Sequence, residues 1–150
     1  MADYFLDSSA FVKRYHPEAG TDKLLALFND PQNRMLISRL TLVETRSAFA
    51  VKVRTGHISE ATALALWIQL LADLSLGIFE VLPMSTAHYA LAEDLIGRYG
   101  FGCRLRTLDG LQLAVVQSQS NYAPIAGFVL ADQVLFEVAS AEKLPTIRLF

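Results

Sequence analysis

The chain has 150 residues, of which 53% are hydrophobic and 19% charged, and its net charge at pH 7 is −2. This length predicts a single domain, residues 1–150, that is large enough to bury a sizeable core. The charge excludes a strongly basic protein and decides little else. The mean hydropathy of +0.34 favours an apolar surface kept for a partner, for example a second copy in a homodimer.

We expect no membrane segment. The most apolar stretch, residues 61–79, contains Gln69 and Asp73 and lacks basic flanks, so we interpret it as a core or interface helix. The first residues do not show the basic and then apolar pattern of an export signal. The single cysteine, Cys103, cannot form an internal disulfide. These features together predict a cytoplasmic protein.

Short apolar runs alternate with longer stretches of helical spacing along the chain. In order, we expect a strand at 4–6, helices at 9–15 and 21–28, a strand at 35–38, helices at 41–55 and 59–75, a strand at 78–83, helices at 85–100 and 107–120, a strand at 125–131, a helix at 132–143 and a strand at 146–150. Gly56 and Gly77 end the two central helices, which should form a helical hairpin. The alternation predicts a three-layer α/β/α fold with a mostly parallel five-stranded sheet.

Four acids stand at element ends, where an open parallel sheet keeps its ligand sites. Asp7 and Asp132 follow the first and fourth strands, and Asp109 lies at the start of a helix. Each aspartate could also serve only as a helix cap. Glu44 stands three residues after Thr41, so these two could form a capping box. Taken singly, each acid is open to both interpretations.

Taken together, the four acids indicate a metal site. Four carboxylates in one cleft would repel one another and raise one another's pKa unless cations were bound. Ligands that are all oxygens favour Mg²⁺ or Mn²⁺ over zinc. Without these acids the rest of the chain would carry a charge of +2 instead of −2. The overall charge is therefore no argument against a nucleic-acid substrate.

Four stretches of the sequence resemble the PIN-domain family and, within it, the VapC-type toxin ribonucleases of bacterial toxin–antitoxin pairs. They are FLDSSAFVKRY at 5–15, TLVETRSAF at 41–49, LRTLDGLQLA at 105–114 and FVLADQVLFEVASAEKLPTI at 128–147. The stretches have the order and spacing of the family and span nearly the whole chain.

The resemblance implies which residues form the site. The catalytic and metal-binding residues would be Asp7, Glu44, Asp109 and Asp132, with Ser8 or Ser9 supporting them and Arg106 close by, within reach of phosphate. Where family members often have a threonine, two residues before the last acid, this chain has Leu130. A further acid that sometimes follows is replaced by the apolar run QVLF at 133–136. Both differences predict a second metal that is weakly held or recruited only with substrate.

The expected function is that of a metal-dependent endoribonuclease toxin that cleaves RNA and is inhibited by a cognate antitoxin protein. The carboxylates would hold one or two Mg²⁺ or Mn²⁺ ions that activate water. A catalytically silent PIN-like binding or scaffold domain is the alternative. An aspartyl phosphotransfer domain is disfavoured, because Ser9 stands where a phosphatase of that type needs a second aspartate. No G-x-G-x-x-G motif for a dinucleotide follows the first strand.

The second helix of the hairpin should supply a partner surface. Its apolar band is broader than one packed face requires and consists of Ala63, Leu64, Leu66, Trp67, Leu70, Leu71 and Leu74. We expect a second subunit or an antitoxin helix to cover part of this band. The other possibility is that both sides of the helix pack within one chain.

Overall fold

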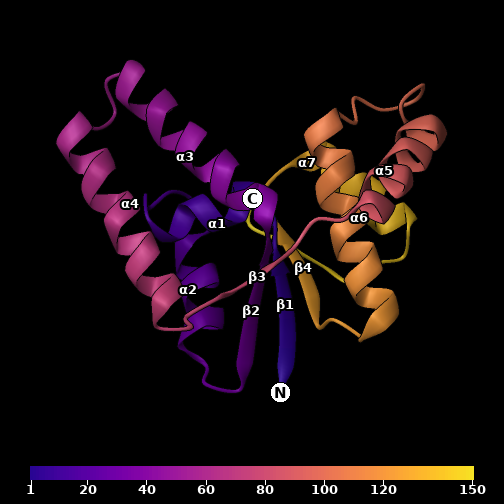
Figure 1. Cartoon of the computed structure of the whole chain (residues 1–150), viewed down its shortest axis with the longest axis horizontal. Coiled ribbons are helices and arrows are strands. Elements are labelled where there is room, and N and C mark those ends of the chain that lie inside the picture. Colours follow the sequence, from indigo (N-terminus) through magenta and orange to yellow (C-terminus); the bar gives the residue numbers. More distant parts are fainter.

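The structure, a computed structural model, describes residues 1–150 and has three layers (Figure 1). The strands are β1 (Ala2–Leu6), β2 (Asn33–Ser38), β3 (Glu80–Leu82), β4 (Gly127–Leu130) and β5 (Thr146–Arg148). The α-helices are α1 (Ser8–Phe11), α2 (Thr21–Asn29), α3 (Arg39–Arg54), α4 (Glu60–Ser75), α5 (Thr86–Tyr99), α6 (Thr107–Tyr122) and α7 (Gln133–Ala141), and a short 3-10 helix, η1 (Val12–Arg14), follows α1. The predicted three-layer α/β/α fold is confirmed.

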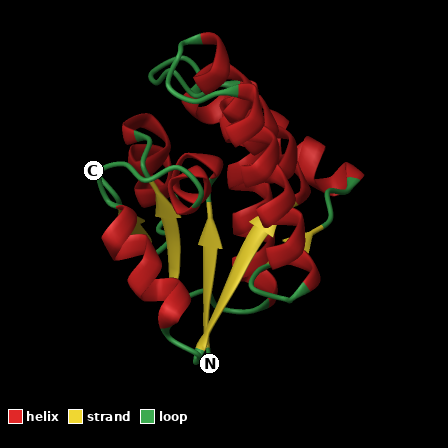
Figure 2. Ribbon diagram, turned by 90° about the vertical axis from the view of Figure 1, so that its left-hand side faces the viewer, coloured by secondary structure: helices red, strands yellow, loops and turns green.

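The sheet has the strand order β3-β2-β1-β4-β5, and all neighbouring strands are parallel. The chain builds outward from β1 through β2 to β3 and then returns to place β4 on the other side of β1. The strands point in one direction, so their carboxyl ends share one edge (Figure 2). The winding reverses between β1 and β4, which is where open sheets of this class bind ligands.

Helices cover both faces of the sheet. Successive strand residues point to opposite faces, so Phe5 packs into the core beneath α5, α6 and α7, and Leu6 packs into the core beneath α1 to α4 (Figure 1). Phe128 and Val129 of β4 are divided between the two cores in the same way. Burial on both faces explains why this strand reads as a continuous apolar run in the sequence.

The helices α3 and α4 form the predicted hairpin, which extends away from the sheet (Figure 1). Gly56 and Gly77, just past the two helices, have φ of 79° and 72°, a backbone conformation that glycine adopts without steric cost. The hairpin is fastened at Asp73 of α4, whose carboxylate accepts a hydrogen bond from the Tyr15 hydroxyl at 2.8 Å and pairs with Arg14 at 3.2 Å. None of the helices has the length and apolar content of a membrane span.

Candidate functional site

The candidate acids lie around the carboxyl edge of the sheet, near the reversal between β1 and β4. Asp7 directly follows β1, and Asp132 stands two residues after β4. The backbone N–H of Asp7 donates to the carbonyl of Val129 at 2.9 Å, which ties the two strands together at this point. Glu44 comes from the first half of α3 and Asp109 from the first turn of α6.

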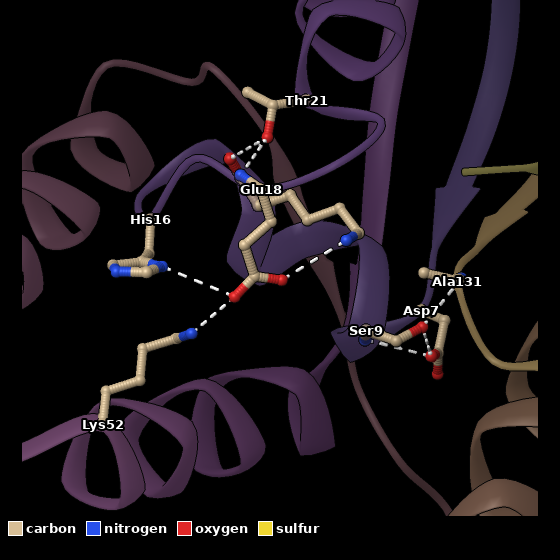
Figure 3. A network of polar contacts seen from close by, with 8 residues as sticks. Asp7, Ser9, His16, Glu18, Thr21, Lys52 and Ala131 are labelled. Carbon is tan, nitrogen blue, oxygen red and sulfur yellow. Dashed lines mark hydrogen bonds and ion pairs between the residues drawn. The ribbon is translucent and has the colours of Figure 1, made fainter. Parts of the chain in front are cut away.

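Asp7 is 6% exposed and is the N-cap of α1. Its Oδ2 accepts hydrogen bonds from the Ser9 N–H at 3.0 Å and from the Ser9 hydroxyl. The same hydroxyl oxygen accepts from the Ala131 N–H, so Ser9 links Asp7 to the segment after β4 (Figure 3). Burial, with smaller contributions from the charges of Glu44 and Asp109, raises the pKa of Asp7 to about 6, although the hydrogen bonds from Ser9 lower it.

Glu44 is held by a buried polar network and caps no helix. The helix α3 begins two residues before Thr41 and has Ser38 as its N-cap, so Thr41 and Glu44 do not form the capping box that their spacing allowed. The Oε1 of Glu44 accepts from the Ser8 hydroxyl at 2.8 Å and from the side-chain amide of Gln112 at 3.1 Å. Its position is therefore fixed by α1 and α6, which are distant in sequence.

Gln112 is the residue that sequence reasoning missed. Its side chain is 1% exposed, and besides Glu44 its amide nitrogen donates to Thr41 at 2.7 Å and to Ser8 at 2.9 Å. Its amide oxygen accepts from the Ser38 hydroxyl at 2.7 Å. A signal was present, since this is the one polar residue in the apolar run LQLAVV. A polar side chain buried in such a run needs partners.

Asp109 and Arg106 bind each other at the start of α6. The Oδ2 of Asp109 accepts from the backbone N–H of Arg106 at 3.3 Å and from its Nε at 3.2 Å. The Asp109 side chain is 13% exposed and that of Arg106 is 74% exposed. Asp109 raises the pKa of the Arg106 guanidinium, and Asp132 and Glu44 contribute to the rise. Arg106 therefore lies in the combined field of three of the four acids.

Asp132 is the N-cap of α7, and its Oδ1 accepts from the Leu135 N–H at 2.8 Å. Like Asp7 and Asp109, it has the capping role that the sequence allowed. Leu130, which replaces the family's frequent threonine, is fully buried in the core beneath α5, α6 and α7. Its side chain offers no oxygen to the sheet edge, so no metal ligand comes from this position.

Each of the four acids uses one carboxylate oxygen for these contacts and keeps the other free of protein donors. The free oxygens are Oδ1 of Asp7, Oε2 of Glu44, Oδ1 of Asp109 and Oδ2 of Asp132. None of them belongs to the buried polar atoms without a partner, so water or an ion can reach each one. Helix capping and metal binding are therefore compatible roles for the same side chain.

The donor chemistry fits a divalent metal, because Mg²⁺ and Mn²⁺ prefer carboxylate oxygens. The spacing is open, however, since no three acidic, histidine or cysteine side chains are grouped closely enough to hold an ion. The cation that pairs with Asp109 is the guanidinium of Arg106. The acids would have to move together to coordinate a metal.

Two hollows flank the acids. The smaller, of about 240 Å³, is lined by Arg104, Arg106, Asp109, Asp132 and Val134. The larger, of about 500 Å³, lies between the α1–η1 segment and α3 and is lined by Ser9 and Glu44 as well as by Lys13 and Lys52. Cationic side chains thus stand on both sides of the acids, an arrangement suited to a chain of phosphates.

The family model of the PIN domain matches residues 4–120. The chain belongs to the PIN-domain family. No curated protein sequence matches it significantly. The five-stranded parallel sheet covered by helices on both faces is thus a PIN fold.

Several solved structures are similar to this PIN domain. VapC20 from Mycobacterium tuberculosis, described as a sarcin–ricin loop cleaving toxin, has a TM-score of 0.68 and 17% identity, with 97% of this chain and 98% of that chain covered. VapBC2 from Rickettsia felis, bound to a DNA fragment from its own promoter, has a TM-score of 0.66 and 15% identity, with 99% of both chains covered. FitAcB from Neisseria gonorrhoeae has a TM-score of 0.66 and 16% identity, with 96% of both chains covered. Identities this low establish the shared fold alone.

Proposed function

We propose that this PIN-domain protein is a metal-dependent endoribonuclease and the toxin of a toxin–antitoxin pair. The observation that carries the proposal is the set of four donor-free carboxylate oxygens around the β1–β4 reversal. Glu44 lines one hollow that contains basic side chains, and Asp109 and Asp132 line another. The description of the similar VapC20 as a toxin that cleaves the sarcin–ricin loop supports RNA as the substrate class.

The side chains of the site have distinct roles in this proposal. One or two Mg²⁺ or Mn²⁺ ions would be held by Asp7, Glu44, Asp109 and Asp132. A bound ion would lower the pKa of water and neutralise charge that develops on the phosphate. Ser9 and Gln112 keep Asp7 and Glu44 in position through the hydrogen bonds described above. Cleavage by in-line attack of water would leave a 5′-phosphate and a 3′-hydroxyl, with Arg106 able to contact the phosphate.

Cleavage of a mixed RNA pool tests the proposal. We expect cleavage in Mn²⁺ or Mg²⁺ that leaves 5′-phosphate ends, stops on chelation and is lost in Asp7→Asn. The open spacing of the acids favours one alternative, a catalytically silent PIN-like binding or scaffold domain. That alternative predicts no cleavage at saturating Mn²⁺, together with intact binding to a partner.

We also propose that a helix of the antitoxin binds the groove between α3 and α4. The groove has a volume of about 400 Å³ and is lined by Arg46, Phe49, Ala50, Val53, Arg54, Glu60, Ala63, Leu64 and Trp67. Leu64 and Ile68 are 57% and 58% exposed, and only Leu70 of α4 is buried. Part of the apolar face of α4 is therefore left uncovered by packing within the chain. An amphipathic helix in an apolar groove is a common mode of recognition.

A homodimer is the second association that we propose. Large apolar side chains are also exposed away from the hairpin, at Tyr89 of α5, at Phe101 after this helix and at Leu108 of α6. A second copy that covered such residues would remove them from water. Light scattering of the isolated chain should give the mass of a dimer, and a monomer at all concentrations would contradict this part of the proposal.

A further inference from the structure

A cluster of charged side chains lines the larger hollow. Glu18, in the loop between η1 and α2, accepts a hydrogen bond from Lys52 of α3 through Oε1. Its Oε2 lies 3.4 Å from the Nζ of Lys13 in η1. The Nδ1 of His16 is 3.4 Å from Oε1 and is buried without a hydrogen bond. Figure 3 shows His16 and Lys52 converging on the Glu18 carboxylate.

This cluster holds more positive charge than its carboxylate balances. Two ammonium groups share Glu18, so one positive charge is in excess even when His16 is neutral. An ammonium has three N–H donors, yet Lys13 and Lys52 each make one hydrogen bond through Nζ. Donors and charge therefore remain available for a second anion.

Lys13 is a cationic side chain at a buried position. Its side chain is only 9% exposed, and its one anionic partner, Glu18, is 39% exposed. The neighbouring Val12 and Tyr15 are buried in the core beneath α1 to α4. Replacing a whole buried ion pair by apolar residues of similar volume is often neutral or stabilising. A lysine at this position thus contributes a charge for which packing offers no explanation.

The hollow joins the cluster to the acids. Glu44 and Lys52 line it from the same face of α3, with Ala48 and Val51 between them. Eight helical residues correspond to a rise of about 12 Å. This distance exceeds the size of one phosphate group. A polyanion that reached both the acids and the lysines would therefore place different phosphates at the two ends of the hollow.

We propose that the hollow between the α1–η1 segment and α3 binds a flanking backbone phosphate of single-stranded RNA through Lys13 and Lys52. Glu18 holds the two ammonium groups in the hollow while RNA is absent and competes with the phosphate for them when RNA enters. The inference rests on the proposed function, because it takes RNA as the polymer that spans the acids and the lysines.

Binding of a short, fluorescently labelled single-stranded RNA of mixed sequence tests the inference. Anisotropy is measured in EDTA, which prevents metal-dependent cleavage, over a range of salt concentrations. Lys13→Gln and Lys52→Gln should each weaken binding and lower the slope of log affinity against log salt, and the double variant should lower it by about 0.7, the value for one phosphate contact on a single strand. Glu18→Gln should strengthen binding by about two- to fivefold, the effect of losing one partly exposed ion pair.

Lys143→Gln is the matched control, because Lys143 lies between α7 and β5, at the amino end of a strand and away from the acids. It should leave the salt slope unchanged. Melting curves report folding, and if Lys13→Gln does not fold, Lys52→Gln and Glu18→Gln decide the question. The inference is overturned if Lys52→Gln and Glu18→Gln both keep the wild-type slope and affinity. It is also overturned if both variants bind RNA more weakly than the wild type and the slope does not change.

The same measurements separate this inference from the proposed nuclease function. If the lysine variants lower the slope while wild-type protein cuts no RNA in Mn²⁺, the phosphate site stands and the nuclease proposal fails. If wild-type protein cuts RNA while Lys52→Gln and Glu18→Gln bind RNA as the wild type does, the nuclease stands and the phosphate site fails.

Discussion

Replacing Asp7 by Asn should stabilise the metal-free protein at neutral pH. Burial raises the pKa of Asp7 from 3.8 to about 6. A difference of this size between the folded and unfolded states corresponds to about 3 kcal/mol. Asn is as good an N-cap as Asp, and its side-chain oxygen can accept the two hydrogen bonds from Ser9. Its amide nitrogen would take the place of Oδ1, which has no protein donor.

The sign of the pH dependence follows from the direction of the shift. Well below pH 3.8 Asp7 is protonated in both the folded and the unfolded chain, so its ionisation does not lower the free energy of unfolding. As the pH rises, the unfolded chain loses the proton first while the folded chain still binds it, so native stability falls until the pH passes about 6. Above that pH both states are ionised, and the full cost of about 3 kcal/mol is present.

Urea unfolding in EDTA at a series of pH values measures this effect. The free energy of unfolding of Asp7→Asn minus that of the wild type should be near zero at about pH 3 and rise to about 3 kcal/mol by about pH 8. Asp22→Asn, on the exposed first turn of α2, is the matched control and should change stability by less than about 0.5 kcal/mol. A difference for Asp7→Asn that does not vary with pH, or that favours the wild type at about pH 8, would refute the reasoning.

Further predictions concern the other acids, their supports and the partner groove. Glu44→Gln keeps an oxygen for its two donors but loses the charge of a proposed ligand, so cleavage should fall by at least about 100-fold, more than the loss of a residue that only supports a ligand would cause, with an unchanged urea midpoint. Gln112→Leu removes the short hydrogen bonds of the buried Ser38 and Thr41 hydroxyls and should cost about 1–3 kcal/mol in urea unfolding, with a loss of about 10- to 100-fold in metal affinity. Arg106→Gln removes the cation paired with a candidate ligand, so it should strengthen Mn²⁺ binding in titration calorimetry while weakening RNA binding. Leu64→Glu should weaken binding to the antitoxin by about tenfold or more, whereas Leu76→Glu, 74% exposed and outside the groove, should not.

Much of the fold could be predicted because the elements carry local signals. A strand buried on both faces reads as an uninterrupted apolar run, as FVL at 128–130 does. The glycines at 56 and 77 mark helix ends because the backbone there needs a positive φ. The order of the strands has no such local signal. It depends on which helices pack against which face, and the chain shows this only when folded.

The site was less predictable, because its contacts also join residues that are distant in the sequence. The Thr41-x-x-Glu44 pattern has the composition of a capping box, but α3 starts at the end of β2 and places Thr41 inside its first turn. The Thr41 hydroxyl is then taken by Gln112, 71 residues further along the chain. No local pattern can report a partner at that distance. A buried polar residue in an apolar run was the only trace that this contact left in the sequence.

An aspartate at one of these positions can cap a helix and bind a metal at the same time. A carboxylate has two oxygens, and a helix N-terminus needs only one of them. The N–H groups that use the first oxygen also hold the second in place, and they favour the ionised form against the cost of burial. Asp109 differs in one respect, because the oxygen that caps α6 is also paired with the 74% exposed side chain of Arg106. If a metal draws the acids together, this ion pair is the one that must be exchanged, and the exchange would free a guanidinium for phosphate at the moment when the metal is in place.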